Sequence, residues 1–257
     1  MKAVPIKFQY ASDLHLEFPE NKEFIKKHPL QTVGEVLVLA GDIVPFAFID
    51  QYKDFFDYVA DHFEKTYWLP GNHEYYHYDI AQKSGVLNEK IRSNILLVNN
   101  TSVVHNNTRL LFSTLWSHIS VGNQWHIERS MNDFRLIKHN GYRFSSEQCN
   151  AFHKESIDFI QNDLKLANEE KIAVFTHHLP TFFNYPEKYK GDALNEAFAV
   201  ELFDVIESSS IDYWVYGHHH CNIPEFNIGK TKLVTNQLGY VQYNENELFK
   251  TDKCIEL

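Results

Sequence analysis

Five short polar clusters along the chain carry side chains that bind metal ions and transfer protons. They are an Asp-x-His, a Gly-Asp, a Gly-Asn-His-Glu, a His-His pair and a Gly-His-His-His. Their candidate residues are Asp13, His15, Asp42, Asn72, His73, His177, His218 and His220. Residues two apart on an extended strand point to the same face, so Asp13 and His15 should lie together, as should His218 and His220. Histidine ligates metals or moves protons near neutral pH.

Seven of these residues form a ligand set of the right size for two metal ions. They offer two carboxylates, four imidazoles and one amide oxygen. Nitrogen and oxygen ligands without a thiolate favour Mn, Fe or Zn. Asp42, a single carboxylate after its strand, is the candidate to bridge the two ions. Two ions roughly 3.5–4 Å apart acidify a bound water and stabilise the attacking and leaving oxygens of a phosphoryl group. The set therefore predicts hydrolysis of a phosphate ester by a metal-activated hydroxide.

His73 is the candidate left outside the ligand set, and we expect it to act as an acid. It directly follows the predicted ligand Asn72. An imidazole at that place can protonate the leaving oxygen, and general acid help is typically worth about 10²–10⁴-fold.

Each cluster follows a short apolar run with the length and β-rich composition of a buried strand. The runs are residues 6–10, 36–40, 67–69, 172–175 and 213–216. Helical patterns lie between them, over residues 52–63 and after the capping-box pair Ser145 and Gln148. Strands alternating with helices predict an α/β fold, whose ligands bind beyond the carboxyl ends of the strands. All five clusters fall at such ends.

Two further elements are predicted in the second half of the chain. Asp192 is expected to cap a helix that carries Leu194, Phe198, Leu202 and Ile206. Residues 223–228 and 231–234, joined at Gly229-Lys230, have the pattern of a β-hairpin.

The composition narrows the class of protein. The formal net charge of -10 argues against a general nucleic-acid binder, which needs a basic patch. The sequence contains no apolar run of about 18 residues, so it predicts no membrane-spanning helix. The 3 cysteines show no paired spacing, and the first residues show no signal peptide, so a cytoplasmic location fits best.

In order and as a set, the five clusters resemble the signature blocks of calcineurin-like metallophosphoesterases, and they span nearly the whole chain. The resemblance implies a single domain over residues 1–257, folded as a four-layer α/β/β/α sandwich of two mixed sheets flanked by helices. It also implies two metal sites that share Asp42. One would use Asp13, His15 and His220, and the other Asn72, His177 and His218. His73 would be the acid or contact the substrate phosphate.

The second block departs from one branch of that superfamily. Protein Ser/Thr phosphatases carry Gly-Asp-x-x-Asp-Arg-Gly there, whereas residues 41–45 are Gly-Asp-Ile-Val-Pro. The Asp that would pair with the catalytic His and the Arg that would bind phosphate are absent. This disfavours a protein phosphatase and leaves His73 without an identified partner. Other strings resemble bacterial predicted phosphohydrolases, among them Met131-Asn132-Asp133-Phe134 and Asn236-Gln237-Leu238-Gly239-Tyr240.

The residues that contact the substrate are less clearly marked. Of two adjacent histidines, we favour His177, at the strand end, as the ligand, and place His178 beside the substrate or behind the ligands. Two segments, 116–143 and 181–191, have the position of lids over the metals, and loops at strand ends carry specificity. Trp116 and Arg135, in the first segment, are candidates to contact the substrate.

Three functions stay open from the sequence. The leading one is hydrolysis of a phosphomonoester or phosphodiester of a small molecule. A repair nuclease branch shares the five blocks, but the acidic charge and the lack of a long C-terminal extension count against it. A retromer scaffold subunit has the same fold but has lost metal ligands or the catalytic His. In the present sequence each of these positions still carries a suitable residue. The sequence specifies neither the metal nor the oligomeric state.

Overall fold

Two mixed six-stranded sheets form the centre of the computed structural model, which describes residues 6–167 and 171–257. The first has the order β14-β1-β2-β3-β5-β4 and comprises Cys254–Glu256, Lys7–Ala11, Val36–Ala40, Lys65–Leu69, Ile95–Asn99 and Leu87–Lys90. The second has the order β12-β13-β11-β10-β7-β6 and comprises Phe226–Ile228, Thr231–Thr235, Tyr213–Tyr216, Lys171–Thr176, Thr108–Ser113 and Thr101–His105.

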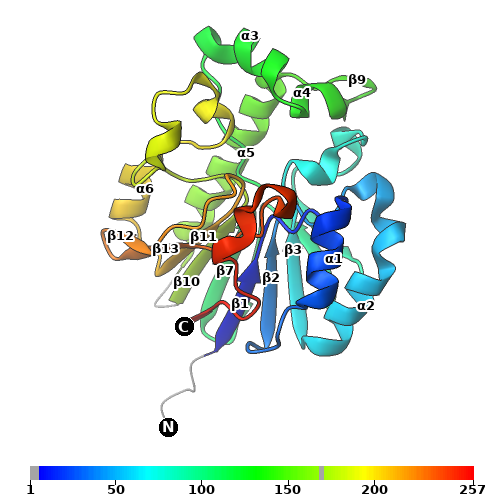
Figure 1. Ribbon diagram of the computed structural model, residues 1–257. Helices are drawn as coiled ribbons and strands as arrows, with labels where there is room; N and C mark the ends of the chain where they lie inside the picture. The colour runs from blue at the N-terminus through cyan, green and yellow to red at the C-terminus, as the bar shows by residue number, and fades with distance from the viewer. Residues whose placement is uncertain (1–5, 168–170) are drawn as a thin grey trace.

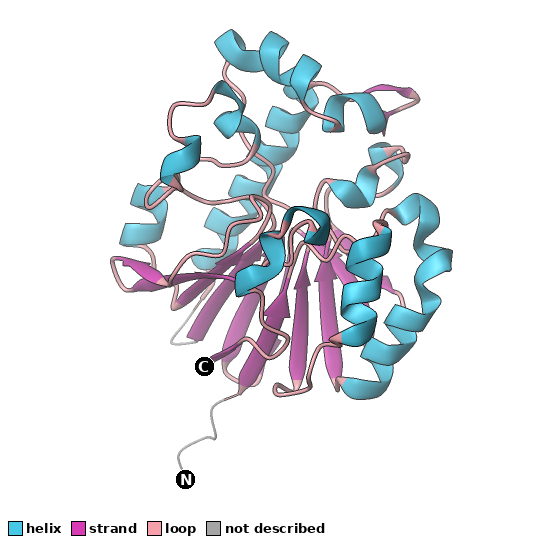
Figure 2. Cartoon of the chain, viewed as in Figure 1, coloured by secondary structure: helices cyan, strands magenta, loops and turns pink. Residues whose placement is uncertain are grey.

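Helices cover the outer face of each sheet (Figures 1 and 2). The first sheet packs against α1 (Pro19–Lys27) and α2 (Lys53–His62), and the second against α5 (Ser146–Leu164) and α6 (Phe203–Ser208). The predicted α/β/β/α sandwich is confirmed. Among the described residues, no helix has the length and apolar character needed to cross a membrane. Residues 1–5, which belong to the predicted single domain, lie outside the described part.

Strand alternation divides the core into layers, as β2 shows. Its residues Val36, Val38 and Ala40 pack between the two sheets, whereas Leu37 and Leu39 face the helices of the first sheet. Side chains alternate between the two faces of a strand, and a strand buried on both faces is apolar throughout. This explains the continuous apolar runs in the sequence.

The five predicted strands are β1, β2, β3, β10 and β11, and their carboxyl ends lie together. Within the first sheet β1, β2 and β3 are parallel, and within the second β10 and β11 are parallel. Above these ends lie α3 (Val121–Ser130), α4 (Asp133–Leu136) and a small hairpin of β8 (Lys138–His139) and β9 (Tyr142–Arg143) (Figure 1). The polar clusters therefore meet under a cover built by the middle of the chain.

The predicted hairpin and capping box are confirmed, but the prediction of one helix from Asp192 to Ile206 is wrong. Asp192 does accept a hydrogen bond from the Leu194 nitrogen, yet the 3-10 helix it caps, η5, ends at Ala197. The chain then runs beside Leu179, whose backbone exchanges hydrogen bonds with Phe198 and Val200. These contacts form a β-bridge between Leu179 and Ala199 that interrupts the helical conformation, and α6 begins only at Phe203.

Candidate metal centre

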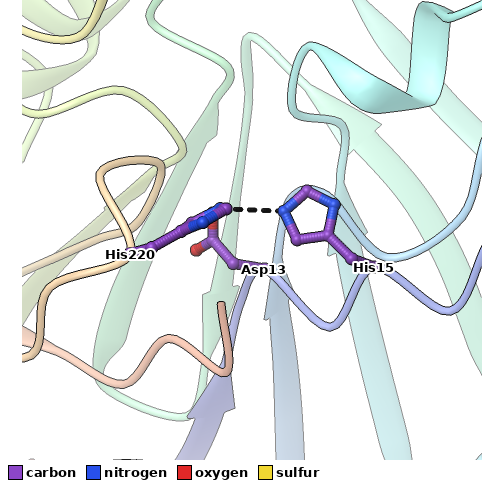
Figure 3. Close-up of side chains that lie close together, drawn as sticks. All are labelled: Asp13, His15 and His220. Carbon is purple, nitrogen blue, oxygen red and sulfur yellow. Dashed lines mark hydrogen bonds and ion pairs between the residues drawn. The ribbon is translucent and has the colours of Figure 1, made fainter. Parts of the chain in front are cut away.

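The eight candidate side chains meet at the carboxyl ends of the strands. Asp13, His15 and His220 form one group, in which the ligand atoms lie within 4.8 Å of one another. Figure 3 shows this group, with His15 Nε2 only 2.9 Å from His220 Nε2. Asp42, His177 and His218 form a second group within the same limit. The family resemblance implied the first of these groups, and for the second it implied Asn72, His177 and His218 with Asp42 shared.

Asp42 lies between the two groups. Its Oδ2 is 3.7 Å from His15 Nε2 in the first group and 3.3 Å from His177 Nε2 in the second. The Asn72 amide joins the second group, with Oδ1 3.1 Å from His177 Nε2. One carboxylate oxygen thus faces both groups, a position from which Asp42 could be shared between two ions.

Each of the four imidazoles uses one nitrogen outside the groups and turns the other inward. The outward contacts are His15 Nδ1 to Glu17 Oε1 (3.2 Å), His177 Nδ1 to the Ala40 oxygen (3.0 Å), His218 Nε2 to the Ala197 oxygen (3.3 Å) and His220 Nδ1 to Glu245 Oε2 (2.8 Å). Because the outward nitrogens can donate to these oxygens, the inward nitrogens can offer their lone pairs to a cation when their protons are displaced. Such acceptors behind ligating histidines are the usual second layer of a metal site. The donor set fits divalent cations.

The carboxylates at the centre attract positive charge. Burial by itself lowers the pKa of His177, but Asp42 outweighs it and raises the value to about 9. Burial likewise opposes a charge on His220, yet Asp13 and Glu245 raise its pKa to about 10. Cations displace such protons when they bind to histidine. The site therefore holds its positive charge either as protons or as metal ions.

The backbone of the site is strained in the way functional sites often are. Five of the candidate residues have left-handed φ angles of +45° to +80°: Asp13, His15, Asp42, His218 and His220. Side chains other than glycine rarely adopt this region, and it persists only where surrounding structure imposes it. The strand ends are bent so that their side chains converge.

A model of the family described as calcineurin-like phosphoesterase matches residues 6–222. The chain belongs to this family. It is accordingly a metal-dependent phosphoesterase, a hydrolase. An uncharacterized protein of Acanthamoeba polyphaga mimivirus is 33% identical over 265 residues, which cover 93% of this chain and 92% of that protein.

Two solved structures are similar to this chain to different degrees. The phosphopantetheinyl hydrolase of Mycobacterium tuberculosis has a TM-score of 0.73 and 14% identity, over 100% of this chain and 97% of that one. A dimetal phosphatase of Danio rerio has a TM-score of 0.43 and 14% identity, over 91% of this chain and 88% of that one. The similarity to the Mycobacterium tuberculosis structure supports the fold of this phosphoesterase.

His73 has a partner that the sequence did not reveal, Glu17. The His73 Nδ1 atom lies 2.8 Å from Glu17 Oε1, and its backbone nitrogen donates to Asp42 Oδ1 at 2.9 Å. Burial raises the pKa of Glu17, but His15 and His73 outweigh it and lower the value to about 2. Glu17 stands two residues after His15, so the every-second-residue spacing of Asp13 and His15 was the available signal. Glu17, which follows the first strand, thus places a carboxylate beside His73, where the second block supplies none.

Replacing Glu17 by Gln is expected to lower kcat about tenfold while KM stays within about twofold. The amide still accepts from one imidazole but removes the charge that orients His73 and supports its protonated form. Steady-state kinetics with metal content measured on the same samples checks this. The control is Glu23→Gln on α1, because the exposed Glu23 pairs with Lys27 and lies outside the cleft lining. Equal kinetics for both variants would exclude the role of Glu17.

The Asn72 amide is oriented by Asp133. Asp133 Oδ1 accepts from Asn72 Nδ2 at 2.9 Å and from the Tyr76 hydroxyl at 2.7 Å. This contact turns Asn72 Oδ1 toward His177. Asp133 belongs to the string Met131-Asn132-Asp133-Phe134, whose role was not apparent from sequence because Asp133 lies 61 residues from Asn72.

A cleft of about 280 Å³ opens onto both groups, and both predicted lid segments reach it. Segment 116–143 contributes Ser130, Met131 and Asn132, and segment 181–191 contributes Tyr189. The remaining lining residues are Asp42, Asn72, His73, Tyr76, Phe198, His218, His219, His220, Tyr240 and Glu245.

The three proposed substrate or second-layer residues lie outside this lining. Trp116 is buried and packs against Phe144 and His178. Arg135 is exposed and bonds Asn132, so it reaches the cleft only through that neighbour. His178 is buried, with Nδ1 3.2 Å from the Thr114 oxygen, and burial lowers its pKa to about 3. His178 and Trp116 therefore support the site from behind.

Proposed function

We propose that this phosphoesterase hydrolyses a phosphate ester of a small molecule at a pair of divalent cations, Mn, Fe or Zn, with His73 as the acid. One observation supports it most: Asp42 Oδ2 lies 3.7 Å from His15 Nε2 and 3.3 Å from His177 Nε2, between two groups of inward-facing ligands. A bridged pair of cations supplies the charge neutralisation and the acidified water that phosphate ester cleavage requires.

In this proposal each side chain of the site has one task. Asp13, His15 and His220 would hold one cation, and Asn72, His177 and His218 would hold the other, with Asp42 shared. The His73 imidazole, with Nδ1 held by Glu17, presents Nε2 to the cleft and gives a proton to the leaving oxygen. Burial lowers the pKa of His73, but Asp42 and Glu17 outweigh it, which favours the protonated imidazole.

A substrate panel with several metals tests the reaction. Purified protein loaded with Mn²⁺ is expected to hold about two ions per chain and to release phosphate or alcohol from an activated mono- or diester. The panel should include nucleotides, sugar phosphates and phosphopantetheine esters, because the Mycobacterium tuberculosis neighbour is named a phosphopantetheinyl hydrolase. Fewer than about one ion per chain, or no turnover with any metal, would contradict the proposal. Cleavage of linear DNA in a parallel assay would instead identify a nuclease.

Replacing His73 by Ala is expected to lower kcat for 4-nitrophenyl phosphate about 10²-fold, with metal content unchanged. This is the lower end for a general acid, because 4-nitrophenoxide leaves with little proton help. His62→Ala is the control, since His62 on α2 is exposed and contacts only Tyr58 among the residues that the structure describes. Full activity of the His73 variant would remove His73 from the reaction.

A further inference from the structure

We infer that Tyr240 is a further catalytic residue, whose hydroxyl hydrogen-bonds the leaving oxygen beside His73; this rests on the proposed function. Tyr240 lines the cleft, and its hydroxyl oxygen lies 3.5 Å from His73 Nε2. That nitrogen is the one that faces the cleft, because the other ring nitrogen, Nδ1, contacts Glu17. A leaving oxygen that enters the cleft on the side of His73 facing Tyr240 can therefore contact both His73 Nε2 and the Tyr240 hydroxyl.

The backbone around Tyr240 is fixed by buried polar contacts. The Tyr240 nitrogen donates to Glu245 Oε2 at 2.7 Å. Asn21, which is completely buried, donates to the Gly239 oxygen at 2.7 Å and accepts from the Val241 nitrogen at 3.1 Å. Both neighbours of Tyr240 are thus tied to one side chain. Tyr240 is held in position, unlike an ordinary surface tyrosine.

The same contacts couple Tyr240 to the metal ligands. The Glu245 carboxylate that holds the Tyr240 nitrogen also accepts from His220 Nδ1 at 2.8 Å. The Tyr240 ring packs against His15 and His220, with centroid distances of 4.8 Å and 4.5 Å, and against Phe18 at 5.1 Å. Ring packing on several sides restricts the direction of the hydroxyl, which therefore stays beside His73.

The hydroxyl has a defined task in ester cleavage. When the bond from phosphorus to the leaving oxygen breaks, that oxygen keeps the electron pair and takes a proton from His73, while water supplies the new oxygen on phosphorus. A hydrogen bond from Tyr240 stabilises the negative charge that grows on the leaving oxygen before the proton arrives. The stabilisation is largest where the leaving oxygen is most basic. The effect of losing the hydroxyl must therefore depend on the leaving group.

The test compares Tyr240→Phe with wild type on two substrates of similar shape, phenyl phosphate and 4-nitrophenyl phosphate, or the matching diesters if the wild type prefers those. We expect kcat/KM to fall at least about tenfold for the phenyl ester and less than about threefold for the nitrophenyl ester. The matched control is Tyr243→Phe, since Tyr243 lies three residues further on and is 68% exposed. That variant should behave as wild type with both esters.

Two results would overturn the role of Tyr240 while leaving the proposed function standing. Equal losses on both esters, or a loss of bound metal, would show that Tyr240 only maintains the shape of the site. Unchanged kinetics on both esters would show that the hydroxyl does not reach the leaving oxygen. If the wild type hydrolyses neither ester and no other substrate in the panel, the proposed function is contradicted. The inference about Tyr240 then fails with it.

Discussion

Replacing Glu74 by Gln is expected to destabilise the protein by about 3 kcal/mol or more and to impair metal binding. The buried Glu74 carboxylate accepts four hydrogen bonds, two on each oxygen. Oε2 takes the nitrogens of Asp42 (2.8 Å) and Gly71 (2.6 Å), and Oε1 takes the Ile43 nitrogen (2.7 Å) and Trp68 Nε1 (3.1 Å). Burial raises the pKa of this carboxyl, but the four donors occupy the lone pairs that a proton would need. The ionised form is therefore the one that fits.

An amide cannot replace that carboxylate in either orientation. Its NH2 group would face two N–H donors, and each buried donor left without an acceptor costs about 1–3 kcal/mol. Urea unfolding in the presence of EDTA measures the loss without counting the stability that bound metal adds. The control is Glu64→Gln, at an exposed position before β3. An unchanged unfolding midpoint for Glu74→Gln would contradict the account.

The importance of Glu74 could be noticed from sequence but not explained by it. The string Gly71-Asn72-His73-Glu74 marks the residue, yet its task is to join the ends of β2 and β3, about 30 residues apart in the chain. Sequence patterns locate strand ends because the period of a strand is local. They do not say which loops meet across a sheet.

At the metal centre, too, the residues marked by a local pattern could be predicted, and those placed by contacts between distant loops could not. The candidate ligands stand directly after apolar runs, so their position follows from the α/β pattern. Glu245 and Asp133 contact His220 and Asn72 across 25 and 61 residues, and no local pattern reveals such pairs. Trp116 was proposed for the substrate because it lies in a predicted lid, whereas the structure packs it into the aromatic core. Position in a loop does not determine which way a side chain faces.

Replacing Gly71 by Ala is expected to lower kcat/KM more than about 10³-fold and to cost about one cation per chain. The added Cβ would lie 2.2 Å from Asp42 Oδ1 and 2.7 Å from the His177 ring. Neither can retreat freely, because Asp42 Oδ1 accepts from the His73 nitrogen and His177 Nδ1 donates to the Ala40 oxygen. The Asp42 carboxylate must then leave its place between the groups. Misplacement of about 1 Å alone costs about 10²-fold, and a lost cation removes several kcal/mol of transition-state stabilisation.

The steric cause of this loss can be separated from an effect on the backbone. Gly71 does not have a left-handed φ, so alanine is compatible with its conformation and only the space is lacking. Gly122→Ala in α3 is the matched control, because a Cβ there meets no atom within 4 Å, and it should keep full metal content and turnover. Metal analysis together with kinetics of both variants decides the matter. Two ions per chain and normal turnover in Gly71→Ala would show that Asp42 does not need its present position. The proposed role of Asp42 as the shared carboxylate would then be contradicted.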